Sequence, residues 1–138
     1  LGRYFMRRRY SPPVEHLDVE TFGMHFSSPI GLAAGYDRNG TMIDTLEAMG
    51  FGYVEIGAVT PREQHNNTSP AIYKFKDDHA LLNSADIDSD GVERVIENVK
   101  RRNSKIIVGC NIAKNSDTDP ENAPRDYLRL FRPLYQTG

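Results

Sequence analysis

Apolar and polar positions form alternating blocks along the chain, and these blocks predict strands and helices in alternation. Three short apolar runs end in small or polar residues, at positions 30–35, 53–60 and 105–115. Apolar residues at helical spacing come after each of them, up to about Met49, from Gly91 to about Arg102, and from Pro120 onward. A run that stays apolar across a core and ends in small residues is typical of a buried parallel strand whose carboxyl end lies at a site.

The remaining segments have weaker patterns. Residues 17–26 alternate on both sides of a central glycine and predict a small β-hairpin. Residues 72–75 predict a surface strand or half of a hairpin, and residues 77–90 predict a polar, acidic loop. Asn39 or Thr41 is the expected N-cap of the first helix.

Strands that alternate with helices predict an α/β fold with parallel pairing through right-handed crossovers. Two architectures fit this order, an open doubly wound sheet and the first part of a (β/α)8 barrel. Both bind ligands at the carboxyl ends of their strands. A whole barrel needs about 250 residues, so 138 residues would form roughly its first half.

Composition narrows the classes of function. The chain is 38% apolar and 26% charged with a net charge of −2, as in ordinary globular domains, and it has no apolar run long enough to span a bilayer. The single cysteine excludes a disulfide framework, and the four histidines have no metal-site spacing, so we expect no metal. Basic residues are scattered outside positions 3–9, which gives no support for nucleic-acid binding.

The candidate site lies where the three predicted strands end. Glycine and alanine there would let a flat ring or a phosphate approach the backbone, and asparagine and basic side chains would supply hydrogen bonds and positive charge. Cys110 precedes Asn111 and therefore faces away from this crevice, as a packed core thiol. The residues concerned are Ala34, Gly35 and Arg38; Gly57, Ala58 and Thr60; and Asn111, Lys114 and Asn115.

Three segments carry a resemblance to a known family. They are PIGLAAGYDRNG at 29–40, MGFGYVEIGAVTPR at 49–62, and GCNIAKN at 109–115 with Asp117 and Thr118. In this order and spacing the chain resembles the N-terminal half of the class 2, quinone-dependent dihydroorotate dehydrogenases. The resemblance runs from about Leu17 to Tyr135.

The resemblance implies the first part of a (β/α)8 barrel, preceded by a short hairpin, with FMN at the barrel mouth. The family oxidises dihydroorotate to orotate in pyrimidine biosynthesis and passes the electrons to a quinone. By position, the resemblance assigns flavin contacts to Ala34, Gly35, Arg38, Ala58 and Asn111, and substrate contacts to Arg38 and Asn83.

The resemblance also implies a division of the chain. Residues 1–16 would be the end of the N-terminal extension that forms the quinone tunnel and contacts the membrane, and residues 17–138 would belong to the barrel. From its basic and aromatic residues alone, the segment 1–10 either lies on an anionic surface or is the end of a preceding helix. The expected location is peripheral, on the cytoplasmic face of a bacterial inner membrane or on the mitochondrial inner membrane, and cytoplasmic if the extension is absent.

The chain departs from the family pattern at several positions. Arg38 replaces a lysine, Ala58 replaces a threonine or serine, and the loop 83–89 reads NSADIDS in place of NRMGFNN.

The catalytic serine base of class 2 is expected after residue 138, so no catalytic residue is assigned here. The alternative is therefore an inactive, truncated relative that acts as a structural or interaction module. Unpaired strand edges would favour self-association in either case.

Overall fold

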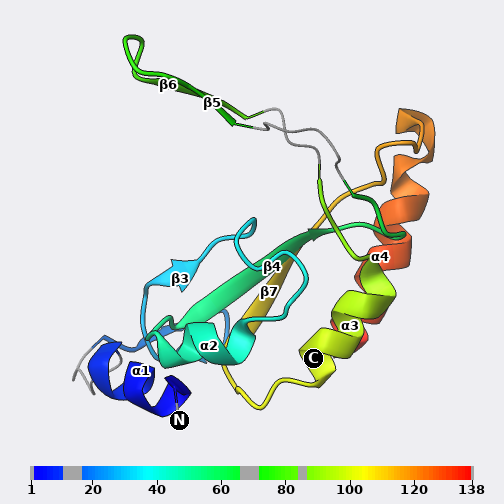
Figure 1. Cartoon of the computed structure of the whole chain (residues 1–138). Coiled ribbons are helices and arrows are strands. Elements are labelled where there is room, and N and C mark those ends of the chain that lie inside the picture. Colours follow the sequence, from blue (N-terminus) through cyan, green and yellow to red (C-terminus); the bar gives the residue numbers. More distant parts are fainter. Residues whose placement is uncertain (1, 11–16, 66–71, 84–86, 138) are drawn as a thin grey trace.

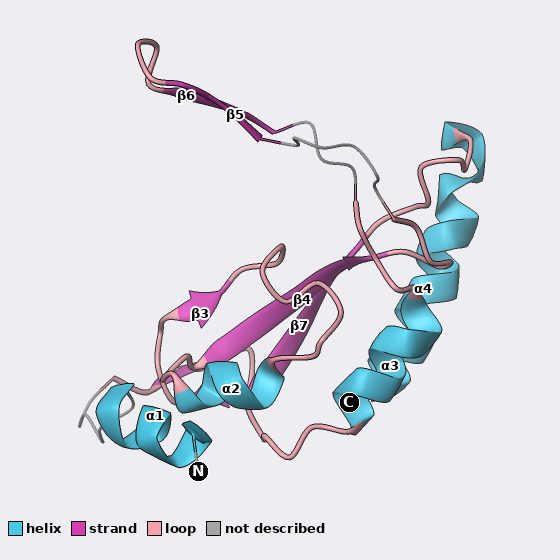
Figure 2. Cartoon of the chain, viewed as in Figure 1, coloured by secondary structure: helices cyan, strands magenta, loops and turns pink. Residues whose placement is uncertain are grey.

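The computed structural model describes residues 2–10, 17–65, 72–83 and 87–137. Strands and helices alternate through most of the chain (Figures 1 and 2). The elements are α1 (Gly2–Tyr10), β1 (Val19–Thr21), β2 (Met24–Phe26), β3 (Gly31–Leu32), α2 (Ile43–Ala48), β4 (Tyr53–Val59), β5 (Ile72–Phe75), β6 (Ala80–Asn83), α3 (Val92–Lys100), β7 (Ile107–Ile112), a 3-10 turn η1 (Pro120–Asn122) and α4 (Ala123–Thr137).

The central sheet has three parallel strands in the order β3, β4, β7. Gly31 is opposite Tyr53, and Tyr53 is in turn opposite Ile107, so the three strands start level with one another. The register between β4 and β7 shifts once, between Ile56 and Val59. Parallel pairing of the three predicted strands is therefore confirmed, and all three carboxyl ends lie at the same edge of the sheet.

The core fills the space between this sheet and the three helices α2, α3 and α4. Along β4 the buried side chains of Val54, Ile56 and Val59 face the helices. Val95 of α3 and Leu130 of α4 are fully buried against them. The helical spacing of apolar residues predicted these faces, because positions three and four apart lie on one side of a helix.

Two antiparallel pairs lie outside the sheet. In the first, Val19 of β1 is opposite Phe26 of β2. In the second, Ile72 of β5 is opposite Asn83 of β6, and this hairpin projects from the rest of the chain (Figure 1). The prediction of a continuous polar loop over 77–90 is wrong at 80–83, because the acidic stretch before these residues is the turn of a hairpin rather than the start of a loop.

The helix at the N-terminus packs beside α2. Its Arg3 donates a hydrogen bond to Asp44 of α2, with Nη1 and Oδ2 2.5 Å apart. Its other arginines and its aromatic residues are largely exposed, since no residue of α1 is buried. Within the described residues, no helix is both long enough and apolar enough to cross a bilayer.

Candidate functional site

The three strand ends meet in the structure. The backbone N–H of Gly35 donates to the carbonyl of Gly57 at 2.8 Å. A Cβ placed on Gly57 would lie 2.4 Å from the carbonyl oxygen of Asn111, so β4 and β7 approach here more closely than any side chain at position 57 would allow. The peptide bond between Gly57 and Ala58 is cis. The structure thus brings Gly35, Gly57 and Asn111 together, as the sequence predicts.

The three strand ends form a surface that consists mostly of the backbone of small residues. Gly35 has a φ of +109°, and nothing lies within 4 Å of the position that a Cβ would occupy there. Ala34 and Ala58 are partly exposed, and Asn111 is exposed. An open, nearly side-chain-free face with one amide at its edge is suited to a flat ligand.

A buried carboxylate fixes the loop that follows β3. Asp37 is 3% exposed and accepts hydrogen bonds from the backbone N–H groups of Thr41 and Met42, both at 2.9 Å. Both donors precede the first helical residue of α2, whose N-cap residue Met42 has no side-chain capping hydrogen bond. The predicted cap by Asn39 or Thr41 is therefore wrong, and the Asp37 carboxylate holds the turn that leads into the helix. Asn39 instead accepts a hydrogen bond from the backbone N–H of Asp90 at 3.0 Å.

Ser89 ties the end of β4 to the start of α3. It is fully buried, and its Oγ lies 3.2 Å from the backbone nitrogens of Thr60 and Gly91, which donate to it. Its own N–H and carbonyl pair with the backbone of Gln64, both at 2.9 Å. The loop that resembles the family's substrate loop is therefore anchored at its end.

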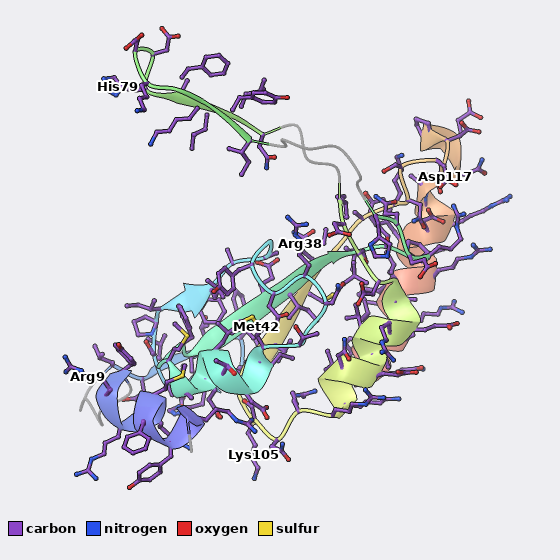
Figure 3. The ribbon with its side chains drawn as sticks, viewed as in Figure 1. Arg9, Arg38, Met42, His79, Lys105 and Asp117 are labelled. Atoms are coloured by element: carbon purple, nitrogen blue, oxygen red, sulfur yellow. The ribbon has the colours of Figure 1, made fainter. Side chains whose placement is uncertain are left out.

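Arg38 lies over the carboxyl edge of the sheet (Figure 3). Its Nε donates to the carbonyl of Gly35 at 3.4 Å, and its Nη1 lies 3.4 Å from Oδ2 of Asp88. The other oxygen of Asp88 lies 2.7 Å from Nδ1 of His65. This hydrogen bond raises the pKa of His65 above its ordinary value, and the negative charges of Asp88, Asp90 and Glu63 act in the same direction. Asp88 belongs to the loop 83–89 whose sequence departs from the family pattern, but its pairing with Arg38 and His65 was not predicted.

Lys114, the second cation expected at the strand ends, binds the backbone of its own loop instead. Nζ of Lys114 donates to the carbonyls of Asn115 and Thr118, at 3.2 and 2.9 Å, so the structure does not support its predicted part in attracting an anion. Asn115 is 2% exposed and holds the backbone of Arg62 through both of its side-chain atoms. It stabilises the loops after β4 and β7 rather than facing the crevice.

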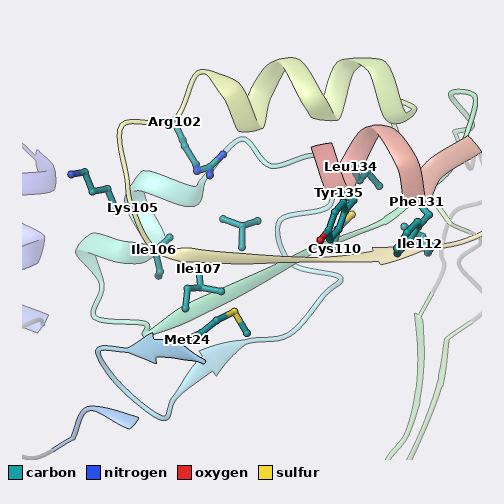
Figure 4. A pocket seen from close by; sticks show the side chains of 11 residues that line it. Met24, Arg102, Lys105, Ile106, Ile107, Cys110, Ile112, Phe131, Leu134 and Tyr135 are labelled. Carbon is teal, nitrogen blue, oxygen red and sulfur yellow. The ribbon is translucent and has the colours of Figure 1, made fainter. Parts of the chain in front are cut away.

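Two other predicted residues lie away from the strand ends. Asn83 ends β6 in the projecting hairpin (Figure 1). Cys110 packs against the core and lines a cavity of about 640 Å³ between β7 and α4, together with Phe131 and Leu134 (Figure 4). Burial raises the pKa of the Cys110 thiol to about 11, and the charge of Glu55 adds to this. The prediction that Cys110 faces away from the crevice is confirmed.

Comparisons with known proteins agree with this geometry. The family described as "Dihydroorotate dehydrogenase" matches residues 16–136. A protein of Vibrio atlanticus named "Dihydroorotate dehydrogenase (quinone)" is 42% identical over 127 residues, which are 92% of this chain and 38% of that protein. A protein of Psychrobacter with the same name is 43% identical over 121 residues, 88% of this chain and 35% of that protein.

Solved structures give the same assignment. The ligand-free dihydroorotate dehydrogenase of Eimeria tenella superimposes with a TM-score of 0.77 at 30% identity, over 99% of this chain and 41% of that one. The same enzyme in complex with ferulenol gives a TM-score of 0.70 at 31% identity, over 96% and 39%. The chain spans less than half the length of these relatives. It belongs to the dihydroorotate dehydrogenase family, whose members are oxidoreductases.

Proposed function

We propose that these residues form the FMN-binding first part of a (β/α)8 barrel that, within a longer chain, oxidises dihydroorotate to orotate in pyrimidine biosynthesis and passes the electrons to a quinone. The observation that carries the proposal is the meeting of Gly35, Gly57 and Asn111 at one edge of a parallel sheet. In open and closed α/β sheets alike, ligands bind at this edge.

The residues present fit a flat cofactor. Gly35 offers an open face, Ala34 and Ala58 add only methyl groups, and the exposed amide of Asn111 supplies donors and an acceptor for the edge of a heterocycle. Arg38 adds a positive charge above the same edge. FMN bound here would supply the electron-accepting ring, while these residues bind and orient it.

The described residues at the strand ends offer binding and orientation rather than proton removal. By resemblance, the serine base belongs to a segment after residue 138, and a general base must lie within hydrogen-bond reach of the proton that it removes. The 138 residues alone are therefore expected to bind ligand without turnover.

The alternative function is that of a catalytically inactive relative, kept as a structural or interaction module. Two observations favour it: Arg38, in place of a lysine, is paired with Asp88, and Ala58 has no hydroxyl to offer a flavin. Both functions share the fold but differ in ligand binding.

Placement in the cell follows from the same assignment. We expect residues 1–16 to belong to a quinone- and membrane-associated extension, because α1 presents Arg7, Arg8 and Arg9 with exposed Tyr4 and Phe5. The expected location is the cytoplasmic face of a bacterial inner membrane or the mitochondrial inner membrane. Co-sedimentation with anionic vesicles measures this contact, and no binding at low salt would contradict it.

Self-association is expected of the isolated chain. In the described sheet, β3 and β7 each have one free edge, and β7 contains no charged residue to block pairing with another chain. Sedimentation velocity over a range of concentrations measures this directly. A monomer at all concentrations would contradict the expectation.

FMN titration of the 138-residue chain tests the proposed function. Saturable quenching of flavin fluorescence is expected, and Gly35→Val should abolish it because the valine side chain would occupy the open face of Gly35. Gly2→Ala, on the exposed helix α1, is the control and should bind as the unaltered chain does. An intact fold that gives no quenching would favour the inactive module.

A further inference from the structure

Asp88 lies between two cationic or cation-forming side chains above the strand ends. One of its oxygens is 3.4 Å from Nη1 of Arg38, and the other is 2.7 Å from Nδ1 of His65. Arg38 is also held by the carbonyl of Gly35 at 3.4 Å. The guanidinium is thus bound to the protein through both Nε and Nη1.

The backbone on both sides of Asp88 is anchored, because on the preceding side the carbonyl of Ile87 accepts a hydrogen bond from Nε2 of Gln64 at 2.8 Å. Ser89 exchanges two backbone hydrogen bonds with Gln64, and the N–H of Asp90 donates to Asn39 in the same loop that carries Arg38. These bonds place the Asp88 carboxylate beside the Arg38 loop without depending on the exposed ion pair itself. The contact is therefore a product of the fold, even though both side chains are more than 40% exposed.

An anionic ligand at the strand ends would need the same guanidinium. Lys114 donates to two backbone carbonyls, which leaves Arg38 as the cation that the described structure places over Gly35. A ligand carboxylate and the Asp88 carboxylate have the same charge and the same preferred geometry toward an arginine. Both cannot hold the same end of the guanidinium.

We propose that Asp88 is a specificity-determining residue of the site, whose carboxylate competes with a ligand carboxylate for Arg38 and so disfavours carboxylated rings relative to neutral ones. The inference rests on the proposed function only in taking a pyrimidinedione as the ligand class. Exposed ion pairs stabilise by amounts equivalent to about a two- to fivefold change in affinity, which bounds the effect.

The test compares two ligands that differ by one carboxylate, orotate and uracil, on the 138-residue chain by NMR titration. Asp88→Asn should lower the Kd for orotate by about two- to fivefold and leave the Kd for uracil unchanged. Asp117→Asn is the matched control: it removes another exposed carboxylate, which pairs with Arg62 at 2.6 Å, and it should change neither Kd.

The His65 resonances report the contact independently of any ligand. In Asp88→Asn the His65 pKa should fall toward its ordinary value, while Asp117→Asn should leave it raised. An unchanged His65 pKa in Asp88→Asn would overturn the proposed geometry. The specificity role would be overturned if the His65 pKa falls as expected in Asp88→Asn but orotate binds equally well to that variant and to the unaltered chain. It would also be overturned if orotate binds to neither.

The FMN titration is a separate measurement, so failure of the cofactor assignment and failure of the Asp88 proposal are distinguishable. Tighter orotate binding by Asp88→Asn without flavin quenching by either chain would support the proposal while contradicting the cofactor. Flavin quenching together with an orotate affinity that Asp88→Asn leaves unchanged would support the cofactor assignment and contradict the Asp88 proposal.

Discussion

Gly57 is the position at which the sheet and the site depend most directly on one residue, and Gly57→Ala is the substitution that tests this. The added Cβ would lie 2.4 Å from the carbonyl oxygen of Asn111 and 2.9 Å from the backbone nitrogen of Val59. Both are backbone atoms, so no side-chain rotation relieves the contact. The φ of +104° adds a second cost, because an alanine is strained in that conformation.

The two costs give the magnitude. A left-handed backbone costs a non-glycine residue about 1–2 kcal/mol, and forcing an extra carbon into a packed region costs about 1–3 kcal/mol. Gly57→Ala should therefore lower the free energy of unfolding by about 2–5 kcal/mol, a large share of the about 5–15 kcal/mol typical of a domain. Urea denaturation followed by far-UV circular dichroism measures it.

Two other glycines separate the cost of the backbone conformation from the cost of the steric contact. Gly35 has a similar φ of +109° but open space around its Cβ position, so Gly35→Ala should show the backbone cost alone, about 1–2 kcal/mol. Gly109 has ordinary contacts of 3.6 Å or more, and Gly109→Ala should stay within about 1 kcal/mol of the unaltered chain. If Gly57→Ala were no more destabilised than Gly35→Ala, the close approach of β4 and β7 at their carboxyl ends would be refuted.

Two further predictions concern the polar groups that support the site. Ser89→Ala should cost about 2–4 kcal/mol because it leaves two buried backbone N–H groups unpaired, whereas Ser27→Ala, on the surface, should cost almost nothing in the same urea assay. Burial acts to raise the pKa of Asp126, but the hydrogen bonds from Thr118 Oγ and a backbone N–H outweigh it, so the folded pKa lies below the ordinary 3.8. A lowered folded pKa contributes stability above about pH 4 that is lost as the pH falls through the folded value. Asp126→Asn should therefore cost about 1–3 kcal/mol at pH 7 and progressively less below pH 4, and a cost independent of pH, or equal to that of exposed Asp119→Asn, would contradict this reasoning.

The regular elements were predictable because their patterns are local. The three strands and the buried face of α3 follow from the periodicity of apolar residues. The hairpin strand at 80–83 was not predictable in this way, since its residues are all exposed and its pairing with residues 72–75 is tertiary information. The role of Asp37 was missed for a related reason: its carboxylate accepts hydrogen bonds from backbone N–H groups four and five residues further along the chain.

The site was predictable where it consists of backbone and not where it consists of side chains. Glycine and alanine at strand ends indicate bare backbone whatever surrounds them. The partner of Arg38 is 50 residues away in sequence, and Lys114 turns back onto its own loop. Charge and type alone could not distinguish a cation that faces the crevice from one that does not.

The anchoring of the Arg38 loop on α3 has a consequence for how this protein could be altered. The Asn39 side chain accepts a hydrogen bond from the backbone N–H of Asp90, just before α3, and the Asn39 carbonyl accepts one from Nδ2 of Asn98 in the last turn of that helix. A shift of α3 along its axis would therefore pull the loop with it. A selection for altered ligand preference should recover changes at Val95, in the buried face of α3, as well as changes in the loop itself.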